Sequence, residues 1–222
     1  MLVVKDVVKK FKNDVVIKNA NMTCKMGTIT GIVGDNGSGK TVLMKLIVGL
    51  MRATEGFITY NSKALKKDFD YLPSVGLIIE HPSFFDELTG FENLKLLANI
   101  NNKISDDEIR TWIKRVGLVD DNKKVENYSL GMRQRLGIAQ ALMENPDVII
   151  LDECTNTLDE NGIHMVHTLL KEEKSKGKII IISSHSRYDI LELCDEIYTI
   201  KEGVLNHAAS KNMDLYSSHS SS

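Results

Sequence analysis

Residues 34–41 have the sequence Gly34-Asp35-Asn36-Gly37-Ser38-Gly39-Lys40-Thr41, which matches the phosphate-binding pattern G-x-x-x-x-G-K-[ST] without a gap. Glycines let backbone N–H groups turn toward phosphate oxygens, and a helix that follows adds the positive end of its dipole. Lys40 can reach the β- and γ-phosphates, and the hydroxyl of Thr41 can hold Mg²⁺. The stretch therefore predicts a phosphate-binding loop.

The flanks of this loop support that prediction. An apolar, β-branched run at residues 28–33 precedes it, and residues 42–50 have a helical pattern that ends near a glycine. The alternative is a chance glycine-rich loop, which the strand before it and the helix after it disfavour.

Composition limits the class of protein. The 222 residues, 42% hydrophobic and 26% charged, suit one or two globular lobes with a substantial core. A net charge of −2 does not favour a nucleic-acid partner. Three cysteines without disulfide or metal spacing predict a reducing cytosol and buried, unreactive thiols. Because no signal-peptide pattern and no apolar run near the ~20 residues of a bilayer span is found, a membrane process would need another chain.

The N-terminal part is predicted to be β-rich, because apolar runs alternate there with turn residues. Within it, Phe11 lies among lysines at positions 9, 10 and 12. The ring has two possible roles: it stacks on an adenine base, or it belongs to the core. The phosphate-binding loop that follows favours stacking.

Residues 81 to about 145 are predicted to form a mostly helical lobe inserted in an α/β domain. Strands at 56–60 and 74–80 precede the lobe, and the second ends in Glu80. From about Thr89 the apolar period becomes helical, and residues 105–108 form a capping box that opens a further helix. We expect this lobe to pack against the core.

A third helix of the lobe is predicted to begin at Ser129, a natural N-cap. Its apolar stripe consists of Met132, Leu136, Ala139 and Met143. The exposed start of the helix, with Ser129 and Gly131, is a second place where phosphate can bind. The alternative is that Ser129 only caps the helix.

Two later strands end in polar side chains. An apolar run at 147–151 leads into Asp152 and Glu153, and a run at 178–182 leads toward His185. Ligands of α/β sheets bind at the carboxyl ends of strands. Beside a phosphate-binding loop, the first carboxylate can order Mg²⁺ and the second can polarise a water molecule. A solvated strand end and a structural histidine are the alternatives.

These motifs, in this order and spacing, resemble the nucleotide-binding subunit of ATP-binding cassette (ABC) transporters over about residues 2–206. The Walker A loop is at 34–41, the signature at 129–132, Walker B at 149–153, the D-loop at 158–159 and the switch histidine at 185. The resemblance implies an α/β P-loop NTPase fold of ABC type, in which a mixed central sheet carries an N-terminal antiparallel β subdomain and an inserted α-helical subdomain. It implies one domain at 1–209, with a core at 1–80 and 146–206, a helical subdomain at about 81–145 and a flexible tail at 210–222.

The resemblance also implies the roles of individual residues. Glu153 would be the general base, His185 would contact the γ-phosphate and Lys40 would neutralise phosphate charge. Mg²⁺ would be held by Thr41, Glu80 and Asp152. The implied contacts to ATP are Phe11, Gly34, Asp35, Asn36, Gly37, Ser38, Gly39, Lys40, Thr41, Val42, Ser129 and Gly131.

Some residues depart from the family pattern. Cys154 follows Glu153 in place of a proline, and Thr157 replaces the glycine before the D-loop. Where the signature usually reads Leu-Ser-Gly-Gly-Gln, residues 128–132 are Tyr-Ser-Leu-Gly-Met. These departures leave slow hydrolysis possible. Glu80 stands where the family usually has glutamine, and with the segments 81–85 and 88–94 it resembles the bacitracin-resistance and lantibiotic-immunity branch.

The resemblance finally implies partners. Two copies would form a head-to-tail dimer in which each ATP lies between the Walker A loop of one copy and Ser129 and Gly131 of the other. A transmembrane permease on a separate chain would hold the dimer on the cytoplasmic face of the membrane and export an antimicrobial peptide or another amphipathic compound. No nucleic-acid partner is expected.

Three alternatives were weighed against this interpretation. Soluble ABC ATPases of DNA repair carry a long coiled-coil insertion and those of translation carry two cassettes, neither of which the sequence has. A switch that dimerises on ATP without hydrolysis is disfavoured by the presence of Asp152, Glu153 and His185. The third alternative is another phosphate-loop enzyme, such as a GTPase or a kinase. The Asn-Lys-x-Asp motif that reads guanine is missing, and such an enzyme would leave the signature helix unexplained.

Overall fold

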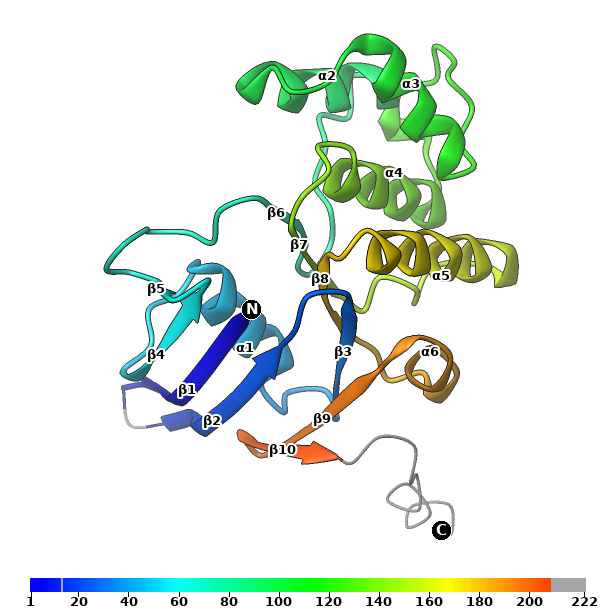
Figure 1. Ribbon diagram of the computed structural model, residues 1–222. Helices are drawn as coiled ribbons and strands as arrows, with labels where there is room; N and C mark the ends of the chain where they lie inside the picture. Colours follow the sequence, from blue (N-terminus) through cyan, green and yellow to red (C-terminus); the bar gives the residue numbers. More distant parts are fainter. Residues whose placement is uncertain (13, 209–222) are drawn as a thin grey trace, which may run out of the picture.

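The computed structural model describes residues 1–12 and 14–208, so the predicted tail from Ser210 lies outside the described residues. The described strands form a ten-stranded sheet with the order β5-β4-β1-β2-β10-β9-β3-β8-β7-β6 (Figure 1). The strands are β1 (Leu2–Phe11), β2 (Asp14–Cys24), β3 (Thr28–Val33), β4 (Glu55–Tyr60), β5 (Lys63–Ala64), β6 (Val75–Ile78), β7 (Val148–Asp152), β8 (Ile179–Ser183), β9 (Glu196–Lys201) and β10 (Val204–Ala208). The helices are α1 (Lys40–Val48), α2 (Gly90–Asn101), α3 (Asp106–Arg115), the 3-10 turn η1 (Val125–Asn127), α4 (Leu130–Leu142), α5 (Glu160–Ser175) and α6 (Arg187–Leu193).

The sheet has an antiparallel part and a parallel part. Strands β1, β2, β4 and β5 pair antiparallel, which confirms the predicted N-terminal β subdomain. Strands β9, β3, β8, β7 and β6 are parallel, and β10 joins the two parts by pairing with β9 and, at Val204 and Lys18, with β2. The mixed sheet of the predicted fold class is therefore present.

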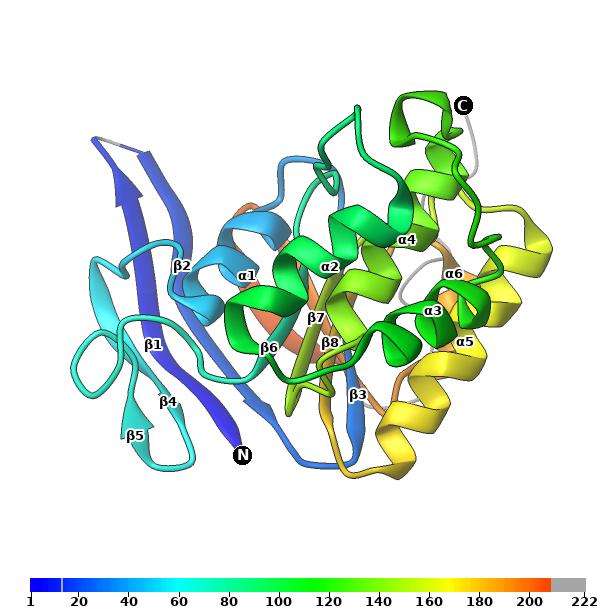
Figure 2. The ribbon, with the colours of Figure 1, turned by 90° about the horizontal axis from the view of Figure 1, so that it is seen from above.

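The parallel strands separate two hydrophobic cores because successive side chains of a strand point to opposite faces. In β8, Ile179 and Ile181 face the core that contains α1, whereas Ile180 and Ile182 face the core that contains α4 and α5. Seen from above, α1 lies on one side of the central strands and α4 and α5 lie on the other (Figure 2).

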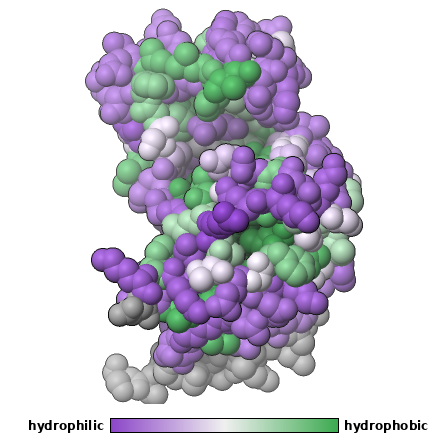
Figure 3. Space-filling view, turned by 90° about the vertical axis from the view of Figure 1, so that its left-hand side faces the viewer, coloured by the Kyte–Doolittle hydropathy of each residue, from purple (hydrophilic) through white to green (hydrophobic). Residues whose placement is uncertain are grey.

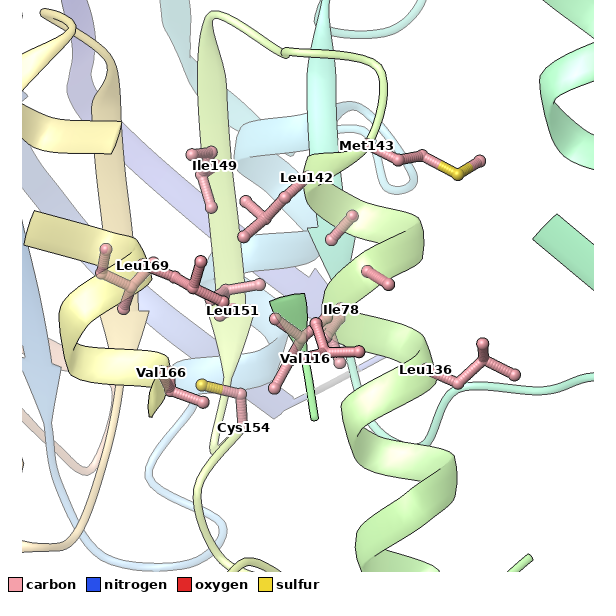
Figure 4. Packing of buried hydrophobic residues seen from close by; sticks show 14 of the residues in the cluster. Ile78, Val116, Leu136, Leu142, Met143, Ile149, Leu151, Cys154, Val166 and Leu169 are labelled. Atoms are coloured by element: carbon pink, nitrogen blue, oxygen red, sulfur yellow. The ribbon is translucent and has the colours of Figure 1, made fainter. Parts of the chain in front are cut away.

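Cysteine 154 belongs to the second core. Its side chain lies between β7 and α5, beside Val166 (Figure 4), and it is almost completely buried. Cys24 is also buried, and Cys194 is partly buried. The three thiols thus pack as small apolar groups, as the sequence predicts.

Helices α2, α3 and α4 occupy the interval between β6 and β7, where the sequence predicts a helical lobe. The predicted capping box of α3 is confirmed, because Ser105 Oγ accepts from Glu108 N–H and the carboxylate of Glu108 accepts from Ser105 N–H. Ser129 is confirmed as the N-cap of α4 and accepts a bond from Met132 N–H at 3.2 Å. A second capping box, Thr89 with Glu92, opens α2.

One predicted element is shorter than expected. Strand β6 ends at Ile78 and does not continue to Glu80. Glu80 has a φ of 63°, a left-handed backbone conformation that cannot continue a strand. The chain turns there toward the loop that leads to α2.

Candidate functional site

A cleft of about 520 Å³ opens at the carboxyl ends of the parallel strands, within the size range of small-molecule sites. Loops after β3, β6 and β7 contribute to it, together with α1 and one side chain of α4. Its walls are formed by Val16, Asn36, Gly37, Gly39, Lys40, Thr41, Val42, Glu80, His81, Gln134, Asp152, Glu153, Asn156 and Thr157. The structure thus places nine of the predicted site residues in one cleft: Asn36, Gly37, Gly39, Lys40, Thr41, Val42, Glu80, Asp152 and Glu153.

The loop between β3 and α1 has a shape that requires glycine at two positions. Gly39, the N-cap of α1, has a φ of 113°, which side chains disfavour. At Gly34, a Cβ atom would lie 2.2 Å from the carbonyl oxygen of Ile200. The start of α1, where the first backbone N–H groups have no partner within the helix, lines the cleft at residues 39–42, as a phosphate site requires.

Lys40 is the buried cation of the site. Its Nζ donates hydrogen bonds to the carbonyl oxygens of Gly34 at 2.7 Å and Asp35 at 3.2 Å. It also lies 3.3 Å from Glu153 Oε1. A buried ammonium group between a phosphate-binding loop and a carboxylate is well placed to neutralise negative charge that enters the cleft.

Thr41 and Asp152 bring two hard oxygen atoms together. Thr41 Oγ1 donates to Asp152 Oδ2 at 2.6 Å, and the other carboxylate oxygen accepts from Ser183 Oγ. Among residues 1–12 and 14–208, no three His, Cys, Asp or Glu side chains come close enough to form a metal site on their own. Mg²⁺ commonly binds through one or two protein oxygens together with substrate phosphates, and this pair fits that pattern.

Glu153 is held by groups from three directions. Its N–H donates to Ser183 at 3.1 Å (O) and 3.0 Å (Oγ), and its carboxylate accepts from Asn156 Nδ2 at 2.6 Å. His185 Nδ1 lies 3.6 Å from Oε2. Burial raises the pKa of Glu153, but the hydrogen bonds from Asn156 and Lys40 outweigh it and lower the pKa below its usual value. The side chain is therefore an ionised carboxylate near neutral pH.

Glu80 connects two hollows of the surface. It lines the main cleft and also a second groove of about 320 Å³ between α1, the end of β6 and α4. Its Oε1 forms an ion pair of 2.5 Å with Lys45, which lies one turn after Thr41 on α1. The carboxylate thus lines the same cleft as Thr41 and Asp152, the other two predicted magnesium ligands.

Several predicted residues lie outside the walls of the cleft. Phe11, the last residue of β1, is 41% exposed, with Lys9 Nζ 4.7 Å from the ring centroid, so the core alternative for Phe11 is wrong. Ser129 and Gly131 begin α4 without lining the cleft, and His185 is 63% exposed at its edge. Gly34, Asp35 and Ser38 belong to the phosphate-binding loop but do not line the cleft. The adenine and signature roles of these residues stay predictions.

Among the contributors to the site that the sequence analysis missed are Ser183 behind Asp152, Asn156 beside Glu153, Gln134 of α4 and Val16 of β2. Asn156 follows Glu153 by only three positions, and that proximity is a usable signal. The others reach the site through tertiary packing, which no local pattern reports.

Comparison with known proteins agrees with this geometry. The sequence pattern of the ABC transporter family matches residues 17–156. An uncharacterized ABC transporter ATP-binding protein of Bacillus subtilis is 46% identical over 206 residues, which cover 92% of this chain and 94% of the relative. The chain belongs to the ABC transporter family. It is one of the ATP-binding subunits of that family.

Two other relatives carry the names of transported compounds. The bacitracin transport ATP-binding protein of Enterococcus faecalis is 39% identical over 89% of this chain and 65% of its own length. The lantibiotic transport ATP-binding protein of Streptococcus pyogenes is 35% identical over 91% of this chain and 88% of its own. The predicted resemblance to the bacitracin and lantibiotic branch of ABC subunits is thereby confirmed.

Solved structures confirm the ABC fold. A dimeric ATP-binding cassette in a post-hydrolysis state, bound to ADP and Pi, superposes with a TM-score of 0.84 and 24% identity, covering 94% of this chain and 98% of that one. An ATP-binding subunit of an ABC transporter gives a TM-score of 0.84 with 27% identity, over 94% and 89% of the two chains. Within the described residues, no helix is both long and apolar enough to cross a membrane.

Proposed function

We propose that this ABC subunit hydrolyses ATP, with Mg²⁺, to drive export through a membrane permease on a separate chain. One observation carries the proposal: a phosphate-binding loop, a lysine, a hydroxyl–carboxylate pair and an ionised glutamate meet in one cleft. Each of these groups has a part in cleaving a phosphoanhydride bond.

The first step is binding of the triphosphate. The N–H groups at the start of α1 donate hydrogen bonds to the phosphate oxygens, and Lys40 turns from the loop carbonyls toward the β- and γ-phosphates. Thr41 and Asp152, with Glu80 as a third candidate, would hold Mg²⁺, which neutralises phosphate charge when bound. Phe11, exposed at the end of β1, would stack on the adenine ring.

The second step is attack by water. Glu153, ionised and fixed by Asn156, takes a proton from the attacking water as general base. His185, at the edge of the cleft, donates a hydrogen bond to the γ-phosphate. The carboxylate of Glu153 lies 3.3 Å from Lys40 Nζ and 3.6 Å from His185 Nδ1. Since both of these residues would contact the γ-phosphate, Glu153 would lie beside it.

A second copy of the chain would complete the site. Ser129 and Gly131 lie at the start of α4, outside the cleft of their own chain. In a two-fold head-to-tail dimer they can reach the ATP bound by the other copy, so that one chain type supplies both halves of each site. Loss of the γ-phosphate would remove that bridge and let the two copies separate.

The surface supports a permease partner. Figure 3 shows hydrophobic side chains gathered on the helical subdomain and in the hollow below it. Leu96 and Ile100 of α2 are exposed, as is Leu50 after α1, beside the groove that Glu80 lines. Such a patch fits an apolar partner surface. The names of the bacitracin and lantibiotic relatives support export of an antimicrobial peptide or similar amphipathic compound, with the subunit on the cytoplasmic face of the membrane.

The test measures phosphate release by the purified chain with Mg²⁺ and ATP. We expect Glu153→Gln to lower turnover by roughly 100-fold or more, because the amide cannot accept the proton. The variant should still bind ATP and collect as a dimer in size-exclusion chromatography. Glu160→Gln, an exposed change at the start of α5, is the matched control and should keep the wild-type rate.

Two results would contradict the proposal. Wild-type turnover in the Glu153→Gln variant would remove Glu153 from the mechanism. A wild-type chain that dimerises on ATP without releasing phosphate would instead be a non-hydrolysing switch.

A further inference from the structure

A buried polar cluster lies behind the site. It consists of Asp189, His167, Thr155 and Ser184, and Asp189 is only 2% exposed. The cluster draws on four parts of the chain: the loop after β7, helix α5, the loop after β8 and helix α6. None of these side chains lines the cleft, and the proposed mechanism uses none of them.

Asp189 is the centre of the cluster. Its Oδ2 accepts hydrogen bonds from Thr155 Oγ1 at 2.7 Å and from Ser184 Oγ at 2.9 Å. Its Oδ1 lies 2.8 Å from His167 Nε2. The ring of His167 stacks on Tyr188 with centroids 5.4 Å apart. Although burial raises the pKa of Asp189, the bonds from His167, Thr155 and Ser184 lower it below the usual value.

The partners of Asp189 flank the two residues that act on the γ-phosphate. Thr155 comes two residues after Glu153, and Ser184 directly precedes His185. One carboxylate oxygen therefore joins the loop that carries the general base to the loop that carries the switch histidine. A further bond, from Ser186 N–H to Ser184 Oγ at 3.0 Å, tightens the second loop.

A purely structural role for Asp189 would be to cap α6, because carboxylates are favoured in the first turn of a helix. The contacts point elsewhere. Ser186 is the N-cap of α6 and accepts from the N–H of Asp189. Among the described residues, the carboxylate of Asp189 bonds only to side chains outside α6. A buried charge is costly unless it is bonded, so its three partners determine where both loops lie.

We propose that Asp189 is a positioning residue for ATP hydrolysis, which sets the distance between Glu153 and His185 through Thr155 and Ser184 while His167 anchors it to α5. This inference rests on the proposed hydrolytic function. Asp189 touches neither the cleft nor the reacting atoms, so its loss should slow the chemical step and spare ATP binding.

The experiment compares kcat, KM and ATP affinity across a small set of variants. Asp189→Ala should lower kcat by roughly 10- to 100-fold, the usual effect of a small misplacement of reacting groups, with KM for ATP within about threefold of wild type. Thr155→Val, which keeps the shape and removes the hydroxyl, should lower kcat in the same direction. Thr155→Ser keeps the hydroxyl and should keep the rate.

The double variant separates positioning from general destabilisation. If both residues act through one bond, Asp189→Ala combined with Thr155→Val will lose no more kcat than Asp189→Ala alone. Asp195→Ala is the matched control. The carboxylate of Asp195 accepts from Ile29 N–H and pairs with Lys174 near the amino end of β3, whereas the cleft lies at the carboxyl ends of the parallel strands. Its loss should therefore lower the melting temperature and leave kcat unchanged.

The outcomes distinguish the two proposals. A wild-type chain that releases no phosphate would overturn the proposed function. If the wild-type chain hydrolyses ATP and the Thr155→Val variant has the same kcat, only the role of Asp189 is overturned. The same follows if the two single losses of kcat multiply in the double variant. If Asp189→Ala does not fold, the kcat values of Thr155→Val and Thr155→Ser still test the proposal, because only the first variant loses the hydrogen bond to Asp189.

Discussion

Glu80 and Glu153 share a backbone conformation that few glutamates adopt. Their φ angles are 63° and 47°, and each residue lies just beyond the end of a parallel strand, β6 or β7. A left-handed backbone strains a residue that carries a Cβ, and such strain concentrates at functional sites. Here it ends each strand abruptly and leaves the carboxylate in the cleft.

The charge of Glu80 should matter for coupling and not for ATP affinity. Glu80→Gln keeps the size of the side chain but removes the ion pair with Lys45, so the groove toward the permease should lose its connection to the nucleotide cleft. We expect ATP binding within about twofold of wild type, because an exposed ion pair contributes little and the amide oxygen of glutamine can still face Mg²⁺. We also expect an altered export or resistance phenotype. Nucleotide titration and a resistance assay in cells that carry the permease measure the two effects.

The control for this change is Glu87→Gln, an exposed glutamate in the loop between Glu80 and α2. It should alter neither ATP binding nor resistance. An unchanged phenotype in the Glu80→Gln variant would show that the carboxylate is not needed for coupling.

At the scale of elements, local signals predicted helix starts well and loop anchoring poorly. Ser105 and Ser129 were identified as N-caps because a cap and its partners lie within one turn. Asn93 of α2 was not identified, since its role depends on a partner eight residues away and on burial by the rest of the fold. It accepts from Phe85 N–H at 2.9 Å and donates to Phe85 O at 3.0 Å.

Asn93 should therefore control the order of the loop that follows Glu80. Asn93→Ala removes both hydrogen bonds to the backbone of Phe85 and leaves Leu88 N–H as the partner of Phe85 O. At about 0.5–1.5 kcal/mol for each lost bond, we expect the free energy of unfolding to fall by about 1–3 kcal/mol. Hydrogen–deuterium exchange should show faster exchange of the Phe85 amide. Asn101→Ala is the control and should leave that amide protected, because Asn101 is exposed at the end of the same helix and its side chain bonds to Glu144. Equal exchange in the two variants would contradict the anchoring role.

At the scale of the molecule, the order of the strands was beyond sequence patterns. Strand β3 pairs with β8, with Thr28 opposite Ile179, although about two-thirds of the chain separates them. A period of two identifies a buried strand but not its neighbour, so the ABC resemblance was needed to predict the mixed sheet. The site motifs, by contrast, are local, and they predicted nine residues of the cleft.

The shared sheet also predicts that the two cores unfold together. The strands β7 and β8 contribute alternate side chains to both cores, so neither core can lose its packing alone. The three cysteines can be used to follow the unfolding of the two cores. Cys24 lies in the core of α1, Cys154 lies in the core of α4 and α5, and Cys194 packs beside the core of α4 and α5. Burial raises the pKa of each thiol to about 12.

Because the thiolate is the reactive form, all three thiols should react slowly with an aromatic disulfide reagent at pH 8 in the native protein. With increasing urea, we expect the three labelling rates to rise at one common midpoint, which peptide mass spectrometry of the labelled sites can measure. Fully unfolded protein, in which the thiols recover ordinary pKa values, is the positive control. Labelling of Cys154 or Cys194 at lower urea than Cys24 would mean that the helical side opens first. In that case the parallel strands would not couple the two cores.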